Sequence, residues 1–283
     1  MIKKILATCF GKAYYNAACT YRQIKTYLYS IVKPYQYDKE RYKNTFLRNN
    51  SSIPERNLNN EPVEKIIYIF WLGDNEITPN RQKGIDSLKN NSDVKVQLVT
   101  PNNLSDYIVE EDPLPEGFDY LSLNHKSDYL RAYFMHHYGG GYADIKTYHH
   151  SWSEAFKQLE NSDAYGLGYN EVGWWGAATQ TITDPYLKED LTKYWRILVG
   201  NGAFIFRKKT PFTEEWHEES KKRLIAASKD LKEHPAKDFF GSNSDYPLQW
   251  GEMQGSIFHP LCLKFNSKLL RNNKIKPSFK DYR

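Results

Sequence analysis

Apolar and polar positions alternate along the chain in patterns that predict strands and helices in turn. A continuous apolar run at 65–72 has the length of a strand and no polar face, which is typical of a strand covered on both sides. A helix from about Pro79 to Leu88 and a second strand at 94–99 follow it. This order of strand, helix and strand predicts a parallel sheet and an α/β fold.

The second half of the chain adds shorter segments with the same alternation. Its mixed order predicts that an antiparallel strand joins the mostly parallel sheet. The expected elements are helices at 152–159 and 211–227, an interrupted helix at 184–198, and short strands at 164–168, 174–178 and 203–206.

The segment 126–146 predicts a helix, a sharp stop and a strand with charged residues at its end. Ser127 is expected to cap the helix, because its hydroxyl can accept a free amide of the first turn. The glycines at 139–141 are expected to end it. In the strand at 142–146, alternation places the polar side chains on one face, and these are Tyr142, Asp144 and Lys146.

This segment resembles the central motif of bacterial and fungal sugar transferases with an Asp-x-Asp signature, above all capsular polysaccharide synthesis proteins. That motif has a Ser-Asp-x-x-Arg helix, a glycine turn and Tyr-x-Asp-x-Asp. Here Lys146 stands in place of the second Asp. Without the resemblance, the same residues describe a solvated helix and an exposed ion pair. The matching residues are Ser127, Asp128, Arg131, Gly139, Gly140, Tyr142 and Asp144.

Two further segments resemble the same families. Trp71-Leu72-Gly73 ends the first strand, where the resemblance implies that Trp71 stacks on a nucleotide base; a core tryptophan is the alternative. The segment 246–260 resembles a closing motif that folds over the donor as a lid, and local helix packing is its alternative. Its second-rank candidates are Trp250, Glu252, Ser256 and His259.

The resemblance implies a GT-A-type fold and a glycosyltransferase. Its donor would be a nucleotide sugar, its acceptor a glycan or lipid-linked glycan of a bacterial capsule or lipopolysaccharide, and its stereochemistry retaining. Asp128 and Arg131 would bind sugar hydroxyls, and Asp144 the ribose or a metal ion, with Trp71 and Tyr142 beside the donor. A non-catalytic binding protein derived from such an enzyme is the alternative, whereas the missing phosphate loop disfavours a phosphotransferase.

The family's divalent cation, Mn²⁺ or Mg²⁺, poses a separate question. An ammonium group cannot supply an oxygen ligand, so only Asp144 of this motif could hold a metal. Either Lys146 itself neutralises the diphosphate, or another acid such as Glu252 completes a metal site. The neighbouring pairs His136-His137 and His149-His150 have diverging side chains, so they are not expected to form metal sites.

At 283 residues the chain has room for one large domain or for a domain plus a helical appendage. We place a basic, tyrosine-rich extension and linker at 1–60 and the transferase domain at 61–283, with helices on both sides of Pro34. Residues 1–45 either touch an anionic membrane or pack on the domain. The net charge of +5 does not indicate nucleic acid. Three unpaired cysteines, no long apolar run and no signal sequence predict a cytoplasmic protein.

Overall fold

A computed structural model describes residues 2–280, with side chains from residue 17 onward, and contains a six-stranded sheet in the order β2-β1-β3-β5-β4-β6. β1 is parallel to β2 and β3, β4 is parallel to β6, and β5 runs antiparallel between β3 and β4. The α/β fold and the late antiparallel strand are therefore confirmed. The strands are β1 (Ile66–Phe70), β2 (Lys95–Val99), β3 (Gly140–Ala143), β4 (Gly166–Asn170), β5 (Val199–Phe206) and β6 (Leu269–Arg271).

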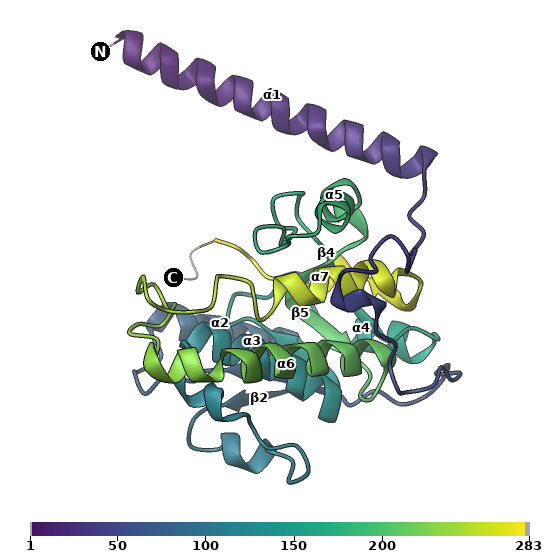
Figure 1. Ribbon diagram of the computed structural model, residues 1–283, viewed down its shortest axis with the longest axis vertical. Helices are drawn as coiled ribbons and strands as arrows, with labels where there is room; N and C mark the ends of the chain where they lie inside the picture. Colours follow the sequence, from purple (N-terminus) through teal and green to yellow (C-terminus); the bar gives the residue numbers. More distant parts are fainter. Residues whose placement is uncertain (1, 281–283) are drawn as a thin grey trace.

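Helices cover both faces of this sheet, which gives three layers (Figure 1). Along β1, Tyr68 and Phe70 pack with α3, α6 and α7, while Ile67 and Ile69 pack with α2 and α4. Successive residues of β1 thus face two different hydrophobic cores in turn. The helices are α1 (Ile2–Val32), α2 (Pro79–Asn91), α3 (Leu123–His137), α4 (Ser153–Glu160), α5 (Pro185–Lys193), α6 (Pro211–Glu233) and α7 (Gly255–Lys264). Short 3₁₀ helices connect them: η1 (Phe46–Arg48), η2 (Leu104–Tyr107), η3 (Glu116–Tyr120), η4 (Trp195–Ile197), η5 (Asn266–Lys268) and η6 (Asn273–Ile275).

The helix of the central motif begins earlier than predicted. The hydroxyl of Ser122 accepts the amide of His125 at 3.2 Å and caps α3. Ser127 lies inside the helix, so the prediction that it forms the cap is wrong. Both serines precede an apolar periodic stretch, and the sequence pattern alone does not distinguish them.

The glycine turn between α3 and β3 is required by backbone conformation and by space. Gly139 and Gly140 have φ values of +67° and +82°, which side chains rarely adopt. A Cβ at Gly140 would also lie 2.8 Å from the carbonyl oxygen of Ile66 on β1. β3 therefore begins at these glycines and ends at Ala143, so that Asp144 follows the strand rather than lying inside it.

Two predicted elements are absent from the described residues. The segment 174–178 is not a strand but a turn, in which the amide of Gly176 bonds the carbonyl of Gly173. Residues 35–45, directly after Pro34, form no α-helix, and contacts with the domain hold them instead. Arg41 and Tyr42 both bond Asp190 of α5, at 2.6 and 2.7 Å.

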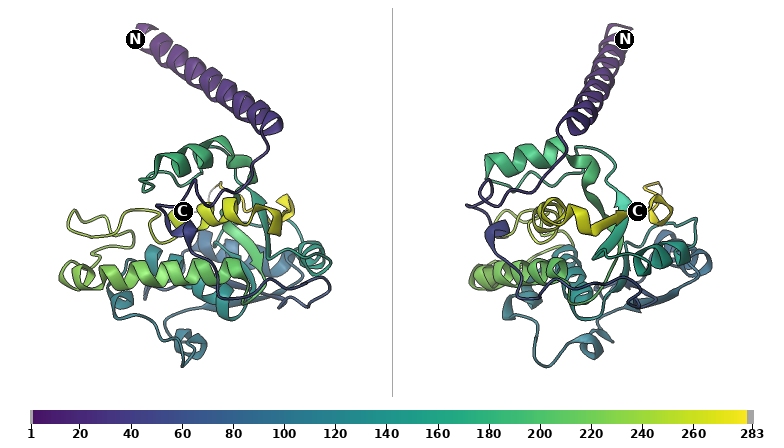
Figure 2. Two further views of the ribbon diagram at one scale, coloured as in Figure 1. Left: turned by 45° about the vertical axis from the view of Figure 1, so that its right-hand side comes forward. Right: turned by 90° about the vertical axis from the view of Figure 1, so that its right-hand side faces the viewer.

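The N-terminal helix α1 stands apart from the body of the molecule above α5 (Figures 1 and 2). Its C-terminal half is attached through Thr26, whose hydroxyl accepts Trp195 Nε1 at 3.2 Å, and through Arg22, which lies 3.9 Å from the ring centre of Trp174. The segment 46–62 is packed on the domain, since Leu47 is fully buried. Within the described residues, no helix combines the length and apolar character that crossing a bilayer requires.

Candidate active site

A cavity of about 830 Å³ opens where the carboxyl ends of β1 and β3 meet, the usual ligand position in an open α/β sheet. Its walls come from several regions of the chain: the carboxyl ends of β1 and β3 with the residues after them, the start of α2, α3, Asn201 of β5, and the segments 175–181 and 239–255. The predicted site residues that line it are Trp71, Asp128, Arg131, Tyr142, Asp144, Lys146 and Trp250.

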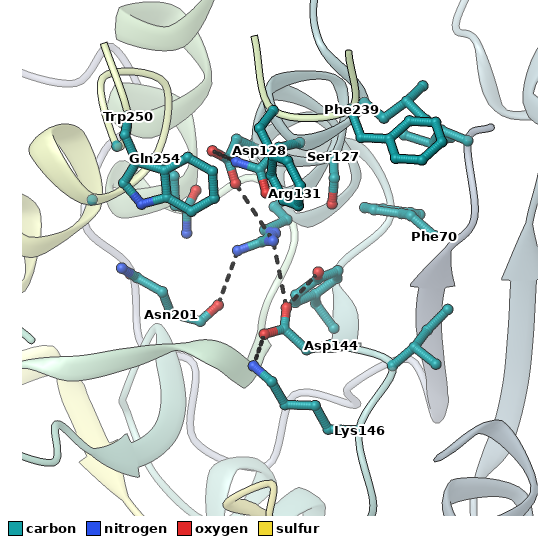
Figure 3. A pocket seen from close by; sticks show the side chains of 18 of the residues that line it. Phe70, Ser127, Asp128, Arg131, Asp144, Lys146, Asn201, Phe239, Trp250 and Gln254 are labelled. Carbon is teal, nitrogen blue, oxygen red and sulfur yellow. Dashed lines mark hydrogen bonds and ion pairs between the residues drawn. The ribbon is translucent and has the colours of Figure 1, made fainter. Parts of the chain in front are cut away.

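Arg131 is the centre of the charged groups in this cavity (Figure 3). The Nη2 atom of Arg131 lies 3.4 Å from Oδ1 of Asp128 and 3.4 Å from Oδ1 of Asp144. The Nη1 atom donates to the carbonyl oxygen of Asn201 at 3.2 Å, and the guanidinium lies 4.5 Å from the ring centre of Tyr142. One arginine therefore joins the Asp128 carboxylate of α3 to the Asp144 carboxylate that follows β3.

Lys146 lies against the same carboxylate as Arg131. Its Nζ is 2.6 Å from Oδ2 of Asp144, and the Tyr142 hydroxyl donates to Oδ1 at 2.8 Å. Burial raises the pKa of Asp144, but the charges of Lys146 and Arg131 outweigh burial and hold that pKa below its usual value. Asp144 is therefore an ionised carboxylate between two cations.

The pKa of Asp128 is shifted in the opposite direction to that of Asp144. Burial raises its pKa to about 6, the negative charge of Asp144 adds to this, and Arg131 lowers it only in part. The two carboxyl groups thus differ in pKa although one guanidinium contacts both. Such a difference between neighbouring acids is typical of functional sites.

Trp71 lies half-buried directly after β1 and lines the cavity. Its indole nitrogen donates to the carbonyl oxygen of Asn75 at 2.8 Å, and its backbone amide bonds Val99 of β2 at 2.9 Å. The indole also packs against the core cluster that contains residues of α2 and α4. Trp71 therefore lies between the core and the cavity wall, a position compatible with either interpretation.

The motif that carries these residues matches a known family. Residues 15–172, more than half of the chain, match capsular polysaccharide synthesis proteins. The chain belongs to this family. Among solved structures, a chain titled "PaToxG Glycosyltransferase" is similar over 72% of this chain and 69% of that chain, with 14% identity and a TM-score of 0.39. No curated protein matches the sequence.

Only one of the four candidates from the closing segment lines the cavity of this family member. Trp250 stands at the rim with 58% of its surface exposed. The other three bond within the protein. Glu252 Oε2 accepts the amide of Gln249, Ser256 Oγ accepts Arg223 at 2.6 Å, and Nδ1 of the buried His259 accepts the amide of Ala178 at 3.0 Å. His259 therefore contacts the loop that lines the cavity without reaching the cavity itself.

The cavity also contains polar residues that the sequence analysis did not select. Arg81 from the first turn of α2 lines it and donates to the carbonyl oxygen of Ile145 at 2.7 Å. Asn201 and Gln254 line it too, and within residues 17–280 the Asn201 Oδ1 and both polar atoms of the Gln254 amide make no hydrogen bond. Gly200-Asn201-Gly202 had the spacing of a turn, which gave no signal of a ligand contact.

The carboxylates at this site do not fit a divalent cation. Both oxygens of Asp144 face cations, Oδ2 at Lys146 and Oδ1 at Arg131. Asp128 shares Arg131, and Glu252, the proposed replacement ligand, does not line the cavity. Because metal ions need several free oxygen ligands, this arrangement favours a site in which side-chain cations supply the positive charge.

Proposed function

We propose that this member of the capsular polysaccharide synthesis family transfers a sugar from a nucleotide-sugar donor to a growing capsule or lipopolysaccharide glycan. The observation that carries the proposal is the convergence of Arg131 and Lys146 on Asp144 at the floor of a cavity edged by Trp71. Membership of the family supports sugar transfer, and the charges on this floor support a donor with a diphosphate.

In the proposed reaction the bond between the sugar C1 and the diphosphate oxygen breaks, an acceptor hydroxyl oxygen bonds to C1, and the proton of that hydroxyl passes to the leaving diphosphate oxygen. Negative charge grows on the leaving diphosphate, so fixed cations stabilise the transition state more than the ground state. Lys146, Arg131 and Arg81 are the cations that line the cavity in the described residues. Asp128 accepts from the donor sugar's hydroxyls in this scheme, and retention of the anomeric configuration follows the family resemblance.

The rim of the cavity supports a glycan acceptor. Four aromatic side chains that are more than half exposed gather around it, and such a cluster of exposed apolar groups marks binding surfaces. They come from two loops, at 171–184 and 234–254. These residues are Trp175, Phe239, Phe240 and Trp250, with exposed fractions of 54%, 53%, 54% and 58%. The flat faces of these aromatic rings can pack against the apolar faces of sugar rings. Figure 3 shows where Trp250 and Phe239 lie.

A panel of nucleotide sugars tests the proposal directly. We expect one donor to be hydrolysed slowly without an acceptor and faster when a capsule-type or lipid-linked glycan is added. NMR of the product anomer then decides between retention and inversion. At position 146 this chain has a lysine where the family's motif has its second Asp. This difference favours one alternative hypothesis, that the protein binds nucleotide sugars without turnover. That alternative predicts a measurable nucleotide-sugar affinity and no release of nucleoside diphosphate from any donor.

Trp71→Ala should weaken nucleotide binding by about 1–3 kcal/mol, the range seen when aromatic stacking on a base is removed. Calorimetric titration with the donor's nucleotide measures this loss. Tyr186→Ala, which removes a 54% exposed aromatic residue on α5 outside the cavity, should leave the affinity unchanged. If the folded Trp71 variant binds the nucleotide as tightly as the wild type, Trp71 is only a core residue.

We also propose that α1 contacts an anionic membrane on the cytoplasmic side, which would place the site near a lipid-linked acceptor. α1 contains Lys3, Lys4, Lys12, Arg22 and Lys25 and no acidic residue. Its exposed apolar side chains recur at helical spacing: Tyr21, Ile24, Leu28 and Ile31 expose 66%, 54%, 55% and 56% of their surface. Identical charges on two copies would repel each other, so this face suits an anionic surface better than a second chain.

Replacing Ile24 and Leu28 together by serine should reduce binding to vesicles containing anionic lipid at least tenfold, since burying one such side chain contributes about 1.5–3 kcal/mol. Vesicle co-sedimentation measures the binding. Ile225→Ser on α6, a control that also exposes 57% of its side chain, should bind like the wild type. Equal binding of the double variant would exclude this face, and a concentration-dependent dimer without vesicle binding would point to self-association.

A further inference from the structure

Three metal-ligating side chains gather at the end of α3 that lies away from the catalytic residues. His137 is the last residue of α3, His217 lies on α6, and Asp112 lies in the loop between η2 and η3. One ligand atom from each lies within 4.8 Å of the other two. None of the three lines the cavity, so the proposed transfer reaction does not use them.

The geometry places one carboxylate oxygen between two imidazole nitrogens. Asp112 Oδ2 lies 2.8 Å from Nε2 of His137 and 2.6 Å from Nε2 of His217. The other oxygen of Asp112 accepts from Lys221, which leaves Oδ2 to the histidines. The side chain of His217 is 1% exposed and that of His137 is 12% exposed. The three side chains therefore lie close to the surface but are largely shielded from water.

The loop that carries Asp112 is fixed by contacts that do not involve the histidines. The hydroxyl of Tyr133 on α3 accepts the amide of Val109 at 2.7 Å and donates to the carbonyl oxygen of Asp112 at 2.9 Å. The backbone of Asp112 is therefore held against α3 whether or not its carboxylate has another partner. A site held in this way needs little ordering when an ion binds.

We propose that Asp112, His137 and His217 bind a zinc ion, with water in the fourth position. Zinc takes nitrogen ligands at about 2.0–2.1 Å and carboxylate oxygens at about 2.0–2.2 Å, usually in a tetrahedron. Ligand atoms around a tetrahedral ion with such bonds lie roughly 3.4 Å apart. The Asp112 oxygen, now 2.8 and 2.6 Å from the two imidazole nitrogens, therefore needs to move away from each of them by less than about 1 Å. Neither adjacent histidine pair forms this site, because His137 pairs with residues from α6 and from the loop.

The ion would connect the loop at 109–115 to both α3 and α6. Its binding energy would add to the stability of the folded chain, because the unfolded chain does not hold the three ligands together. The alternative is a charge network without metal, in which both imidazoles donate to Asp112 beside Lys221. Both states use the same residues, and direct metal measurement decides between them.

The test uses the full-length protein after treatment with a chelator, titrated with zinc alone in competition with a chromogenic chelator. We expect one zinc per chain and a rise in melting temperature. In His137→Gln the zinc affinity should fall at least about 100-fold. A loss of up to about 100-fold is seen when a residue that only hydrogen-bonds a metal ligand is removed, and here a ligand itself is removed. The matched control is His234→Gln, since His234 also lies 3.5 Å from a carboxylate, that of Asp245, on the surface.

Cobalt titration of the wild type gives a readout that does not depend on any variant folding. A visible spectrum of a four-coordinate Co²⁺ ion supports the proposal, and the same spectrum should be absent from Asp112→Asn. The proposal is overturned if the wild type takes up no zinc and shows no change in melting temperature. Equal zinc affinity in the wild type and His137→Gln would overturn it as well.

Discussion

Turnover by the wild-type protein should survive EDTA, and Lys146→Ala should lose activity about 10²–10³-fold when no metal is present. The reason is that Lys146 stands where the family's second carboxylate would help to hold a metal, and an ammonium group can neutralise a leaving diphosphate directly. The loss corresponds to removing one preorganised charge from a transition state. Release of nucleoside diphosphate, followed with and without the chelator, measures both effects.

Two variants sharpen this test. Lys146→Asp restores the family's Asp-x-Asp pattern and should be active only with added Mn²⁺ or Mg²⁺. Lys95→Ala removes a lysine from the exposed start of β2, and its activity should equal that of the wild type. If wild-type activity vanishes on chelation and returns with Mn²⁺, then a metal binds with other ligands and the charge-replacement hypothesis is wrong.

Arg131→Ala should lose most activity and also unfold more easily, by about 3–5 kcal/mol, the cost of removing one partner from a buried ion pair. The stability loss is expected because Arg131 is the cation between Asp128 and Asp144, and all three side chains are largely buried. Arg131→Lys keeps the charge and should recover most of the stability, but it cannot reach both carboxylates and the Asn201 carbonyl together.

Asp128→Asn separates function from stability at the same position. Burial raises the Asp128 pKa to about 6, above its value in the unfolded chain, so the ionised form costs stability as the pH rises through about 6. At pH 8 the asparagine variant should therefore be as stable as the wild type, yet transfer much less sugar. Chemical denaturation and donor turnover, measured on the same sample, test this. A parallel loss of stability and activity would mark Asp128 as a structural residue.

The sequence predicted the α/β fold, the first strand and the glycine turn before β3, because these depend on local patterns. The apolar run at 66–70 and the glycines at 139–141 dictate a buried strand and a sharp turn wherever they occur. The family resemblance then selected Asp128, Arg131 and Asp144, which the fold brings together from a helix and a strand end.

What the sequence missed depends on contacts between distant segments. In the sequence, Arg81 is a polar residue near the start of a helix, with nothing to indicate a ligand contact. Its place in the cavity depends on the packing of α2 beside Ile145. The segment after Pro34 has no helix because Asp190, about 150 residues away, binds Arg41 and Tyr42. The contact of His137 with Asp112 likewise depends on a residue 25 positions away in the chain.

The contact between Arg22 of α1 and Trp174 has a consequence for how an acceptor is found. Trp174 lies next to Trp175, which is part of the cavity rim, so the helix and the opening are joined through one short segment. With α1 on a membrane, a lipid-linked acceptor would reach the opening by lateral diffusion in two dimensions. Tethering both partners to one surface gives an effective concentration in the millimolar range. An acceptor site can then be intrinsically weak and still be filled, whereas the same lipid dispersed in detergent would seem a poor substrate.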